Sequence, residues 1–377
     1  MTTKPYDVAI VGAGLAGSSV ARAAVARGLS VYAVDRHRPP HDQGSSHGET
    51  RLFRMANFEG PHYTPLAKYA REAWIGLGEE QGVRLFEATG VLHVGCPGGV
   101  LLDQVRQVTA DAPELFEELS ARPFGLTIPD GWRVFNDRQG GYLYAEPCIE
   151  ALLEAAQGVT FESDKTCTAI GGDADGAWIR VGDETIRAKT VVVAAGAWLP
   201  TLVADFEPDT LPLSRQTLHW FDDPQRRFTL EAGFKPFIVE WQPGAFIYGF
   251  PTNAAGRMKI ASHVTGEVVS HPREIDRHVS DADKLAIVAF AAKFLEGLGN
   301  WVEGRVCMYP GTSDGNFLIG PLPGKPNIVL CAGLGGHGFK FGPALGEIVV
   351  NLVEGKTPEI AFDRARFLPD RLLAGSR

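Results

Sequence analysis

A glycine-rich turn near the N-terminus constrains the fold more than any other feature of the sequence. Residues 7–11 (DVAIV) form a short apolar, β-branched run that is typical of a buried parallel strand. The turn itself, residues 12–17 (GAGLAG), is followed by an alanine-rich stretch that favours a helix up to Gly28. Residues 30–34 then predict a second strand, which ends at Asp35. Strand, glycine turn, helix, strand and acid in this order predict a dinucleotide-binding βαβ unit.

Each part of this unit has a physical role. Gly12 permits the tight turn, Gly14 lets the backbone approach a pyrophosphate, and Gly17 lets the helix pack on the strand. The helix N-terminus offers free N–H groups and a positive dipole end to phosphates. Asp35 can accept hydrogen bonds from ribose hydroxyls and would repel a 2′-phosphate, which argues against NADP. The turn alone does not distinguish FAD from NAD.

Two later strands favour FAD. Residues 190–194 (TVVVA) precede Ala195-Gly196-Ala197-Trp198, and residues 327–330 (NIVL) precede residues 331–336 (CAGLGG). In two-domain flavoproteins, late strands of this kind return to the nucleotide domain and end beside the cofactor. The alternative is that they are two further buried strands without a ligand.

The rest of the chain predicts a second domain, because single hydrophobic cores stop growing near about 250–300 residues. We expect an α/β (α+β) fold, in which a Rossmann-like FAD-binding domain (1–85, 145–210 and 315–377) is interleaved with a mixed-sheet substrate domain (86–144 and 211–314). The active site should lie at their junction. The expected elements outside the βαβ unit are a helix within about 100–120, a helix at 145–157, strands at 211–221, 237–241, 246–250 and 258–262, and a helix near 281–295.

Composition excludes several classes of protein. The net charge of −9 is scattered along the 377 residues without a basic stripe, so we expect no nucleic-acid partner. No apolar run reaches the roughly 18 residues of a membrane span. The five cysteines lack the spacing of a zinc site or a disulfide framework, so we expect no metal. A strand pattern begins almost at once, without a signal peptide, and a cytoplasmic location is the expectation.

Four separated motifs carry a resemblance to a known family. They are residues 44–54 (GSSHGETRLFR), 258–263 (MKIASH), 305–309 (RVCMY) and 336–341 (GHGFKF). In order and spacing they resemble the monomeric sarcosine oxidase and N-methyltryptophan oxidase family, over about residues 6–355. The resemblance implies a monomeric FAD-dependent amine oxidase that oxidises a C–N bond in a small amino-acid-like amine. Dioxygen would take the electrons, and an imine or iminium and hydrogen peroxide would be formed.

The resemblance also implies roles for individual residues. Cys307 matches the cysteine that binds the flavin covalently, and Lys259 matches the lysine that activates dioxygen, where a buried cation stabilises developing negative charge. Arg54 and Lys340 match the pair that holds the substrate carboxylate. Further catalytic candidates on the substrate side are His263, Tyr248 and Tyr309. The remaining cofactor candidates are Arg36, Ser45, His47, Thr50, Arg51, Ala195, Gly196, Trp198, Gly335, Gly336, His337, Gly338 and again Lys340.

Several positions depart from the family pattern. Met55, Asn57, Val239, Gly335 and Ser46 stand where the family often has other residues, and several of the changes are to smaller groups. We therefore expect a secondary amine that is bulkier than sarcosine, either an N-alkyl or a cyclic amino acid.

Two alternatives remain open from the sequence. One is a non-covalent FAD enzyme of the glycine or D-amino-acid oxidase type, or a dehydrogenase that uses another electron acceptor. The other is a nucleotide-binding protein without catalytic activity. Covalent flavin would argue against the first, and substrate-dependent bleaching of the flavin would exclude the second.

Overall fold

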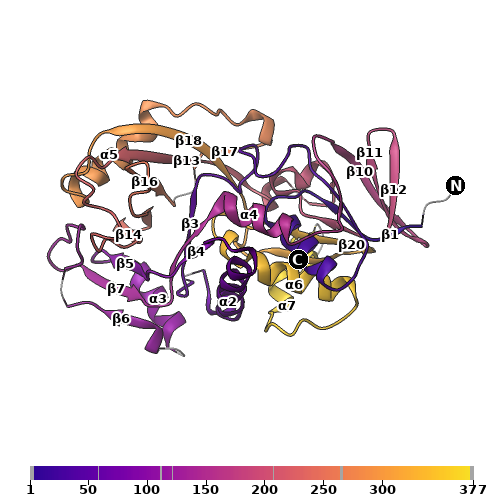
Figure 1. Ribbon diagram of the computed structural model, residues 1–377, viewed down its shortest axis with the longest axis horizontal. Coiled ribbons are helices and arrows are strands. Elements are labelled where there is room, and N and C mark those ends of the chain that lie inside the picture. Colours follow the sequence, from indigo (N-terminus) through magenta and orange to yellow (C-terminus); the bar gives the residue numbers. More distant parts are fainter. Residues whose placement is uncertain are drawn as a thin grey trace.

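The computed structural model describes residues 4–57, 59–110, 113–120, 122–206, 208–263 and 266–373. Within these residues the strands form two large sheets and a small one, and Figure 1 shows the two large sheets at opposite ends of the molecule. The chain passes between the two ends several times, so each sheet combines segments that are far apart in the sequence.

The first large sheet has a parallel centre. Its strands are short apolar runs buried on both faces, as expected for strands with helices on one face and further chain on the other. β12 has two neighbours at its C-terminal half, β1 and β20, because Val191 pairs with both Ala9 and Ile328. The spatial order at the centre is β20 (Lys325–Ala332), β12 (Glu184–Val193), β1 (Tyr6–Val11), β2 (Val31–Val34) and β9 (Thr160–Glu162).

Helices cover one face of this sheet, and small residues let them approach closely. A Cβ at Gly346 would lie 2.4 Å from the carbonyl oxygen of Ser19, so α6 can rest directly on α1 only with glycine there. An antiparallel extension covers the other face together with a 3₁₀ turn, η3 (Gly196–Thr201). The helices are α1 (Leu15–Ala26), α2 (Thr64–Gln81), α4 (Ala145–Glu154) and α6 (Gly342–Val353), and the antiparallel strands are β10 (Cys167–Asp173), β11 (Gly176–Val181) and β19 (Leu318–Leu322).

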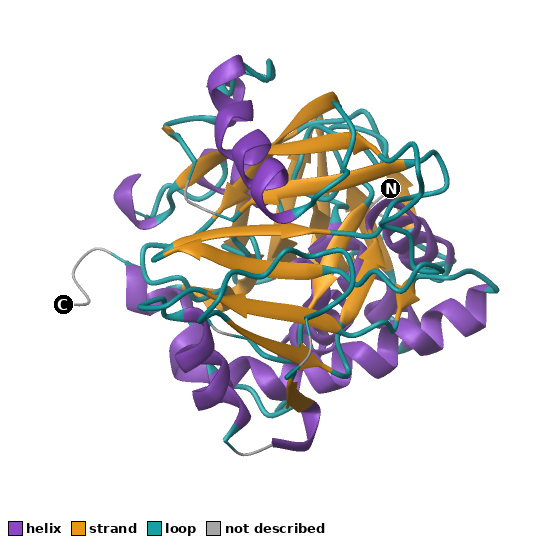
Figure 2. Ribbon diagram, turned by 90° about the vertical axis from the view of Figure 1, so that its left-hand side faces the viewer, coloured by secondary structure: helices purple, strands orange, loops and turns teal. Residues whose placement is uncertain are grey.

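The second large sheet is mixed, and Figure 2 is turned so that this end of the molecule faces the viewer. Helix α5 (Asp281–Phe294) packs on one face and begins at a capping box between Ser280 and Asp283. The other face is directed towards the parallel sheet and contributes to the site described below. Its strands are β17 (Val268–Val269), β18 (Trp301–Pro310), β13 (Leu213–Asp222), β16 (Arg257–Ser262), β15 (Ala245–Gly249), β14 (Phe237–Gln242), β5 (Val91–Gly95), β7 (Arg133–Asp137) and β6 (Phe116–Glu118).

The small sheet lies between the two large ones in Figure 1. It contains β3 (Thr50–Phe53), β8 (Gly141–Tyr144) and β4 (Phe86–Glu87). The other elements are α3 (Leu101–Thr109), α7 (Arg364–Phe367), η1 (Pro61–Tyr63), η2 (Pro113–Leu115), η4 (Pro208–Thr210), η5 (Pro272–Glu274), η6 (Phe339–Phe341) and η7 (Pro369–Leu372).

The predicted fold class is confirmed, including the interleaving of a Rossmann-like part with a mixed-sheet part. The predicted helix within 100–120 is shorter in the structure, where α3 ends at Thr109 and β6 begins at Phe116. Pro113 lies between them and cannot continue a helix, because it lacks an N–H group. The exact domain boundaries stay a prediction. Among the described residues, every helix is too short or too polar to span a bilayer.

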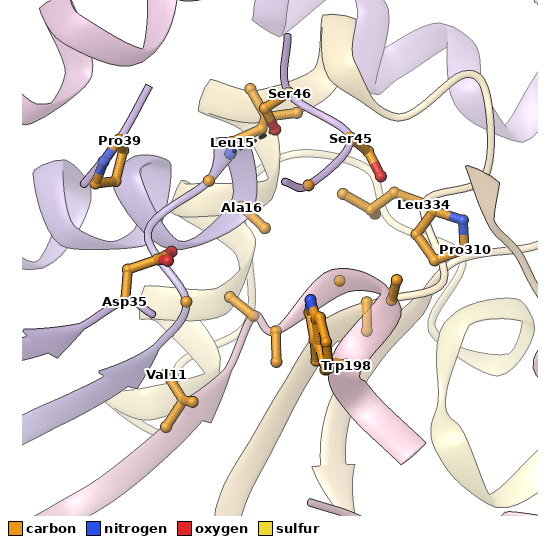
Figure 3. A pocket seen from close by; sticks show the side chains of 18 of the residues that line it. Val11, Leu15, Ala16, Asp35, Pro39, Ser45, Ser46, Trp198, Pro310 and Leu334 are labelled. Carbon is orange, nitrogen blue, oxygen red and sulfur yellow. Dashed lines mark hydrogen bonds between the residues drawn. The ribbon is translucent and has the colours of Figure 1, made fainter. Parts of the chain in front are cut away.

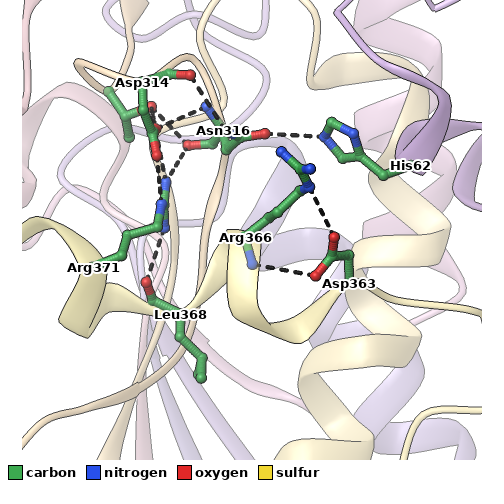
Figure 4. Close-up of polar contacts among 8 residues, drawn as sticks. His62, Asp314, Asn316, Asp363, Arg366, Leu368 and Arg371 are labelled. Atoms are coloured by element: carbon green, nitrogen blue, oxygen red, sulfur yellow. Dashed lines mark hydrogen bonds and ion pairs between the residues drawn. The ribbon is translucent and has the colours of Figure 1, made fainter.

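A C-terminal clasp, residues 363–373, ties the end of the chain to the loop between β18 and β19 (Figure 4). Arg371 donates to both carboxylate oxygens of Asp314, at 2.7 and 3.0 Å, and to the carbonyl oxygen of Asn316 at 2.8 Å. Asn316 in turn contacts His62 of η1 through a 3.0 Å hydrogen bond. Arg366, in contrast, pairs only with the nearby Asp363, and both side chains are largely exposed.

We expect Arg371→Ala to lower the free energy of unfolding by about 2 kcal/mol, because it removes charge-assisted bonds from a largely buried guanidinium. The matched variant Arg366→Ala should change it by less than about 0.5 kcal/mol, because surface pairs contribute little. Urea denaturation followed by tryptophan fluorescence measures both. Equal effects of the two substitutions would show that the clasp does not depend on Arg371.

Candidate active site

The glycine turn between β1 and α1 leaves no room for side chains at two of its positions. Gly12 has a φ of +95°, and a Cβ there would lie 2.5 Å from the carbonyl oxygen of Ala194. A Cβ at Gly17 would lie 1.8 Å from the carbonyl oxygen of Gly12. The turn therefore packs against both the end of β12 and its own helix, and both positions require glycine.

Asp35 at the end of β2 fixes the geometry of the turn. Its carboxylate accepts from the backbone N–H of Ala13 at 2.7 Å and from that of His37 at 2.9 Å. Burial raises the pKa of this carboxyl, but hydrogen bonds from His41, His37 and Ala13 outweigh burial and the net pKa is lowered. The carboxylate is thus ionised at neutral pH.

A long cavity of about 180 Å³ lies at the carboxyl ends of the parallel strands, where open α/β sheets bind ligands. Figure 3 shows Asp35, Ser46 and Trp198 around it, contributed by separate segments of the chain. The predicted cofactor residues that line it are Gly12, Gly14, Asp35, Arg36, Ser45, Arg51, Ala195, Gly196, Trp198, Gly335 and Gly336.

The residues of this cavity fit a dinucleotide. The guanidinium of Arg36 lies 4.0 Å above the ring of Trp198, which gives one end a flat and cationic surface. Gly196 and Gly335 line the cavity with φ of +53°, and nothing lies within 4 Å of a Cβ at Gly196. His47 Nε2 is buried and has no hydrogen-bond partner among the described residues, but His47 does not line the cavity. FAD would be held by the residues that line the cavity and by N–H groups at the start of α1, where the N–H of Leu15 donates to Ser46 Oγ at 3.2 Å.

The segment 45–54 passes between the two large sheets and carries Arg51. Its guanidinium donates to the carbonyl oxygens of Ser45 at 2.9 Å, Thr50 at 2.8 Å and His47. Glu146 at the start of α4 accepts from the N–H groups of Gly48 and Glu49. Charged groups from outside and inside the segment therefore fix its backbone.

Lys259 on β16 is buried beneath this segment. Its ammonium donates to the carbonyl oxygens of Gly48 and Thr50, both at 2.6 Å, and lies 4.5 Å from the ring centre of Phe250. Burial, and then the nearby Arg51, hold its pKa well below the usual range. The two carbonyls use two of its three N–H donors.

A second, smaller cavity of about 40 Å³ adjoins the first. Arg51, Tyr309, Gly336 and Phe339 line both cavities, so the two meet at these residues. The complete lining of the smaller cavity is Arg51, Leu52, Arg54, Ile238, Tyr248, His263, Tyr309, Gly336, His337, Phe339 and Lys340.

Arg54 and Lys340 place buried positive charge at this smaller cavity. Their side chains belong to residues that are only 4% and 2% exposed, and cations buried to this degree usually have a partner. Arg54 donates to the carbonyl oxygen of Ala56 at 3.1 Å and to Glu59 at 2.6 Å. The indole N–H of Trp74 donates a hydrogen bond of 2.8 Å to the backbone carbonyl oxygen of Lys340. Burial, followed by repulsion from Arg54, lowers the pKa of Lys340 to about 7.

Aromatic side chains form the opposite part of the cavity. The ring of His263 lies 6.3 Å from that of Tyr248 and 5.8 Å from that of Tyr309, and the two tyrosine hydroxyls share a hydrogen bond. Burial, and then Arg54, lower the pKa of His263 to about 4, so the imidazole is neutral at neutral pH. The three predicted substrate-side residues thus lie together with Arg54 and Lys340.

Cys307 is buried on β18, two residues before Tyr309. Its sulfur lies 3.8 Å from the carbonyl oxygen of Ser45, behind the lining of the larger cavity. Other predicted residues also lie outside both linings, namely Gly17, His47, Thr50, Lys259 and Gly338. His337 and Lys340 line the smaller cavity.

The positions that depart from the family pattern do not line the smaller cavity, which corrects the premise of the sequence interpretation. Ser46 and Gly335 line the larger cavity instead. Val239 faces the core beneath α5, while its neighbour Ile238 faces the smaller cavity, because successive residues of a strand point to opposite faces. Met55 is buried in the core on the helical side of the parallel sheet.

Sequence reasoning missed two buried carboxylates near Arg54. One is Glu59, its ion-pair partner. The other is Asp137 at the end of β7, which accepts from the N–H groups of Met55 at 2.6 Å and Ala56 at 3.2 Å. Burial raises the pKa of Asp137 to about 6. In the sequence both lie in polar, glycine-containing stretches that are typical of exposed turns. The only signal for Glu59 was its position five residues after Arg54, and Asp137 had no such signal.

Comparison with known proteins agrees with this geometry. The chain is 32% identical to an N-methyl-L-tryptophan oxidase of Citrobacter koseri, covering 97% of this chain and 99% of that protein. It is also 32% identical to one of Yersinia pestis, covering 96% and 99%.

Solved structures of low sequence identity share the fold. NikD, an unusual amino acid oxidase essential for nikkomycin biosynthesis, superimposes in its open form with a TM-score of 0.83 at 22% identity, covering 97% of this chain and 98% of that one. Glycine oxidase from Geobacillus kaustophilus does so with a TM-score of 0.77 at 21% identity, with the same coverage. The family described as DAO, FAD dependent oxidoreductase, matches residues 7–352. Since this match spans most of the chain, the protein belongs to the DAO family of FAD-dependent oxidoreductases.

Proposed function

We propose that the protein oxidises the C–N bond of an N-alkyl or cyclic amino acid, with dioxygen as the electron acceptor. One observation carries the proposal: the buried cations Arg54 and Lys340 line a small cavity that shares lining residues with the cofactor cavity. A carboxylate is the group that such a pair of cations binds best. Relatives named N-methyl-L-tryptophan oxidase, at 32% identity, support an N-alkyl amino acid as the substrate.

The residues of the smaller cavity would position the substrate. Arg54 and Lys340 would hold its carboxylate, which directs the amine and the adjacent C–H towards the place where the two cavities meet. His263, Tyr248 and Tyr309 are uncharged at neutral pH, so the lining near the amine favours its neutral form, whose lone pair assists the loss of hydride. FAD, when bound, accepts the two electrons from that C–H bond.

Lys259 would serve the reduction of dioxygen. Its ammonium is held by Gly48 and Thr50, and its remaining N–H donor can stabilise negative charge as dioxygen is reduced to hydrogen peroxide. Cys307 would attach the cofactor covalently. A monomeric state and a cytoplasmic location belong to the same proposal.

The substrate would be bulkier than sarcosine. This part of the proposal is supported by the names of the relatives, which contain a tryptophan-derived substrate. The five positions that differ from the family pattern do not support it, because they do not line the smaller cavity. The second candidate is a non-covalent enzyme of the glycine or D-amino-acid oxidase type. The position of the Cys307 sulfur behind the Ser45 carbonyl favours that candidate, because attachment requires the sulfur to reach the cofactor.

A panel of amines tests the proposed reaction. We expect N-methyl and cyclic amino acids larger than sarcosine to bleach the flavin without oxygen, and to release hydrogen peroxide in air with higher kcat/KM than sarcosine. Amines of the same size without a carboxylate should be at least about 100-fold poorer, because they lose the charge-assisted bonds to Arg54 and Lys340. Failure of every secondary amino acid to bleach the flavin would refute the proposal.

Acid precipitation of the purified protein tests Cys307. We expect the yellow colour in the pellet for the wild type and in the supernatant for Cys307→Ser. Cys331→Ser is the matched control, because Cys331 is also buried and lines the cofactor cavity, and it should keep the colour in the pellet. Wild-type colour in the supernatant would favour the non-covalent candidate.

Stopped-flow kinetics test Lys259. In Lys259→Met we expect reoxidation of the reduced enzyme by dioxygen to slow by about 100-fold or more, since a buried cation is lost, while reduction by substrate changes little. Lys284→Met removes a surface lysine and should leave both steps unchanged. A normal rate of reoxidation in Lys259→Met would show that dioxygen reacts elsewhere.

A further inference from the structure

Glu59 is a buried carboxylate next to the proposed carboxylate site. Its Oε1 lies 2.6 Å from Arg54 Nη2, and its side chain is 13% exposed. Burial raises its pKa, but the attraction of Arg54 and then Lys340 outweighs burial and brings the pKa well below the usual range. Glu59 therefore carries a full negative charge at neutral pH.

The carboxylate stands behind the wall of the smaller cavity. Arg54, His337 and Lys340 line the cavity, whereas Glu59 does not. Its second oxygen, Oε2, is buried and has no hydrogen-bond partner among the described residues, and Oε1 lies 3.9 Å from His337 Nδ1. Burial lowers the pKa of His337 to about 3, so this imidazole is neutral and does not compensate the carboxylate. Glu59 thus acts on the cavity through its charge and not by filling its space.

A fixed charge in such a place has a large effect on a second charge. In a region that excludes water, two like charges a few ångströms apart repel far more strongly than the same pair does in water. Arg54 donates to Glu59 at 2.6 Å, so a carboxylate bound at Arg54 would lie close to the charge of Glu59. One carboxylate can therefore be held by Arg54 and Lys340, but a second one would face Glu59.

We propose that Glu59 determines the charge specificity of the cavity, so that the protein takes amines with one carboxylate and rejects those with a second. The inference rests on the proposed function and deepens it, because it names a monocarboxylate substrate class. Removal of the Glu59 charge should convert the cavity into one that accepts a dianion.

Two probes of the same shape test the charge alone. Malonate and its monoamide, malonamate, differ only in that a neutral amide replaces one carboxylate. Neither compound has a carbon that carries both an amine and a hydrogen, so neither can be oxidised by the proposed reaction. Their dissociation constants can be measured on the flavin-loaded protein at about pH 7 from the change in flavin absorption. We expect the wild type to bind malonamate at least about tenfold more tightly than malonate. In Glu59→Gln, which keeps the size of the side chain, this ratio should fall by about tenfold or more.

Two variants serve as controls. Glu59→Asp keeps the charge and should keep the preference for malonamate, which separates charge from folding should Glu59→Gln be unstable. Glu72→Gln also breaks an arginine–glutamate pair of 2.6 Å, that of Arg71 and Glu72, but on an exposed face of α2, and it should leave both constants unchanged.

Other outcomes would overturn the inference. An unchanged ratio in Glu59→Gln, with both probes weakened or strengthened equally, would mean that Glu59 only positions Arg54. If neither probe binds to the wild type, the proposed carboxylate site does not exist. Oxidation of secondary amino acids in the amine panel would then show whether the proposed reaction survives without that site.

Discussion

The architecture depends on the compensation of buried charge along the segment 45–54. This segment passes between the two large sheets, and its carbonyl oxygens accept from two cations, the buried Lys259 of the mixed sheet and the partly buried Arg51 of the segment itself. Glu146, at the start of a helix of the nucleotide part, binds N–H groups of the same segment. Since an uncompensated charge in such an interior is costly, the two parts of the molecule can approach only with these groups in register.

The same segment lies between cations that bind backbone carbonyls and a cation that lines the smaller cavity. Arg51 and Lys259 are bound to backbone carbonyls. Arg51 lines both cavities, whereas Lys259 lies behind residues 48–50. Arg54, three residues after Arg51, lines the smaller cavity and donates to the carboxylate of Glu59 and to the carbonyl oxygen of Ala56. Asp137 accepts from the two N–H groups that follow Arg54, so a buried carboxylate from the mixed part also fixes the point at which the segment leaves the site.

The parts of the molecule that could be predicted from the sequence are those whose causes are local. The glycine turn is one, because the steric demands at Gly12 and Gly17 exist within a single βαβ unit. The face of a strand to which a side chain points is also a local property. Lys259 lies opposite to Met258 and Ile260, because successive residues of a strand point to opposite faces. The same alternation places Val239 away from the cavity and Ile238 towards it, which a residue-by-residue match to a family did not reveal. Glu59 and Asp137 could not be predicted, because their burial is a property of the assembled fold.

The position of β20 in the parallel sheet has a consequence for folding during synthesis. This strand is the neighbour of β12, and α6, which follows it, rests on α1 through Gly346. The glycine turn thus leaves the ribosome long before the strand and helix that complete its surroundings. Until they arrive, the early βαβ unit has an incomplete sheet and one uncovered helix. A nascent chain of this protein therefore cannot enclose FAD in the finished cavity until β20 and α6 have been synthesised.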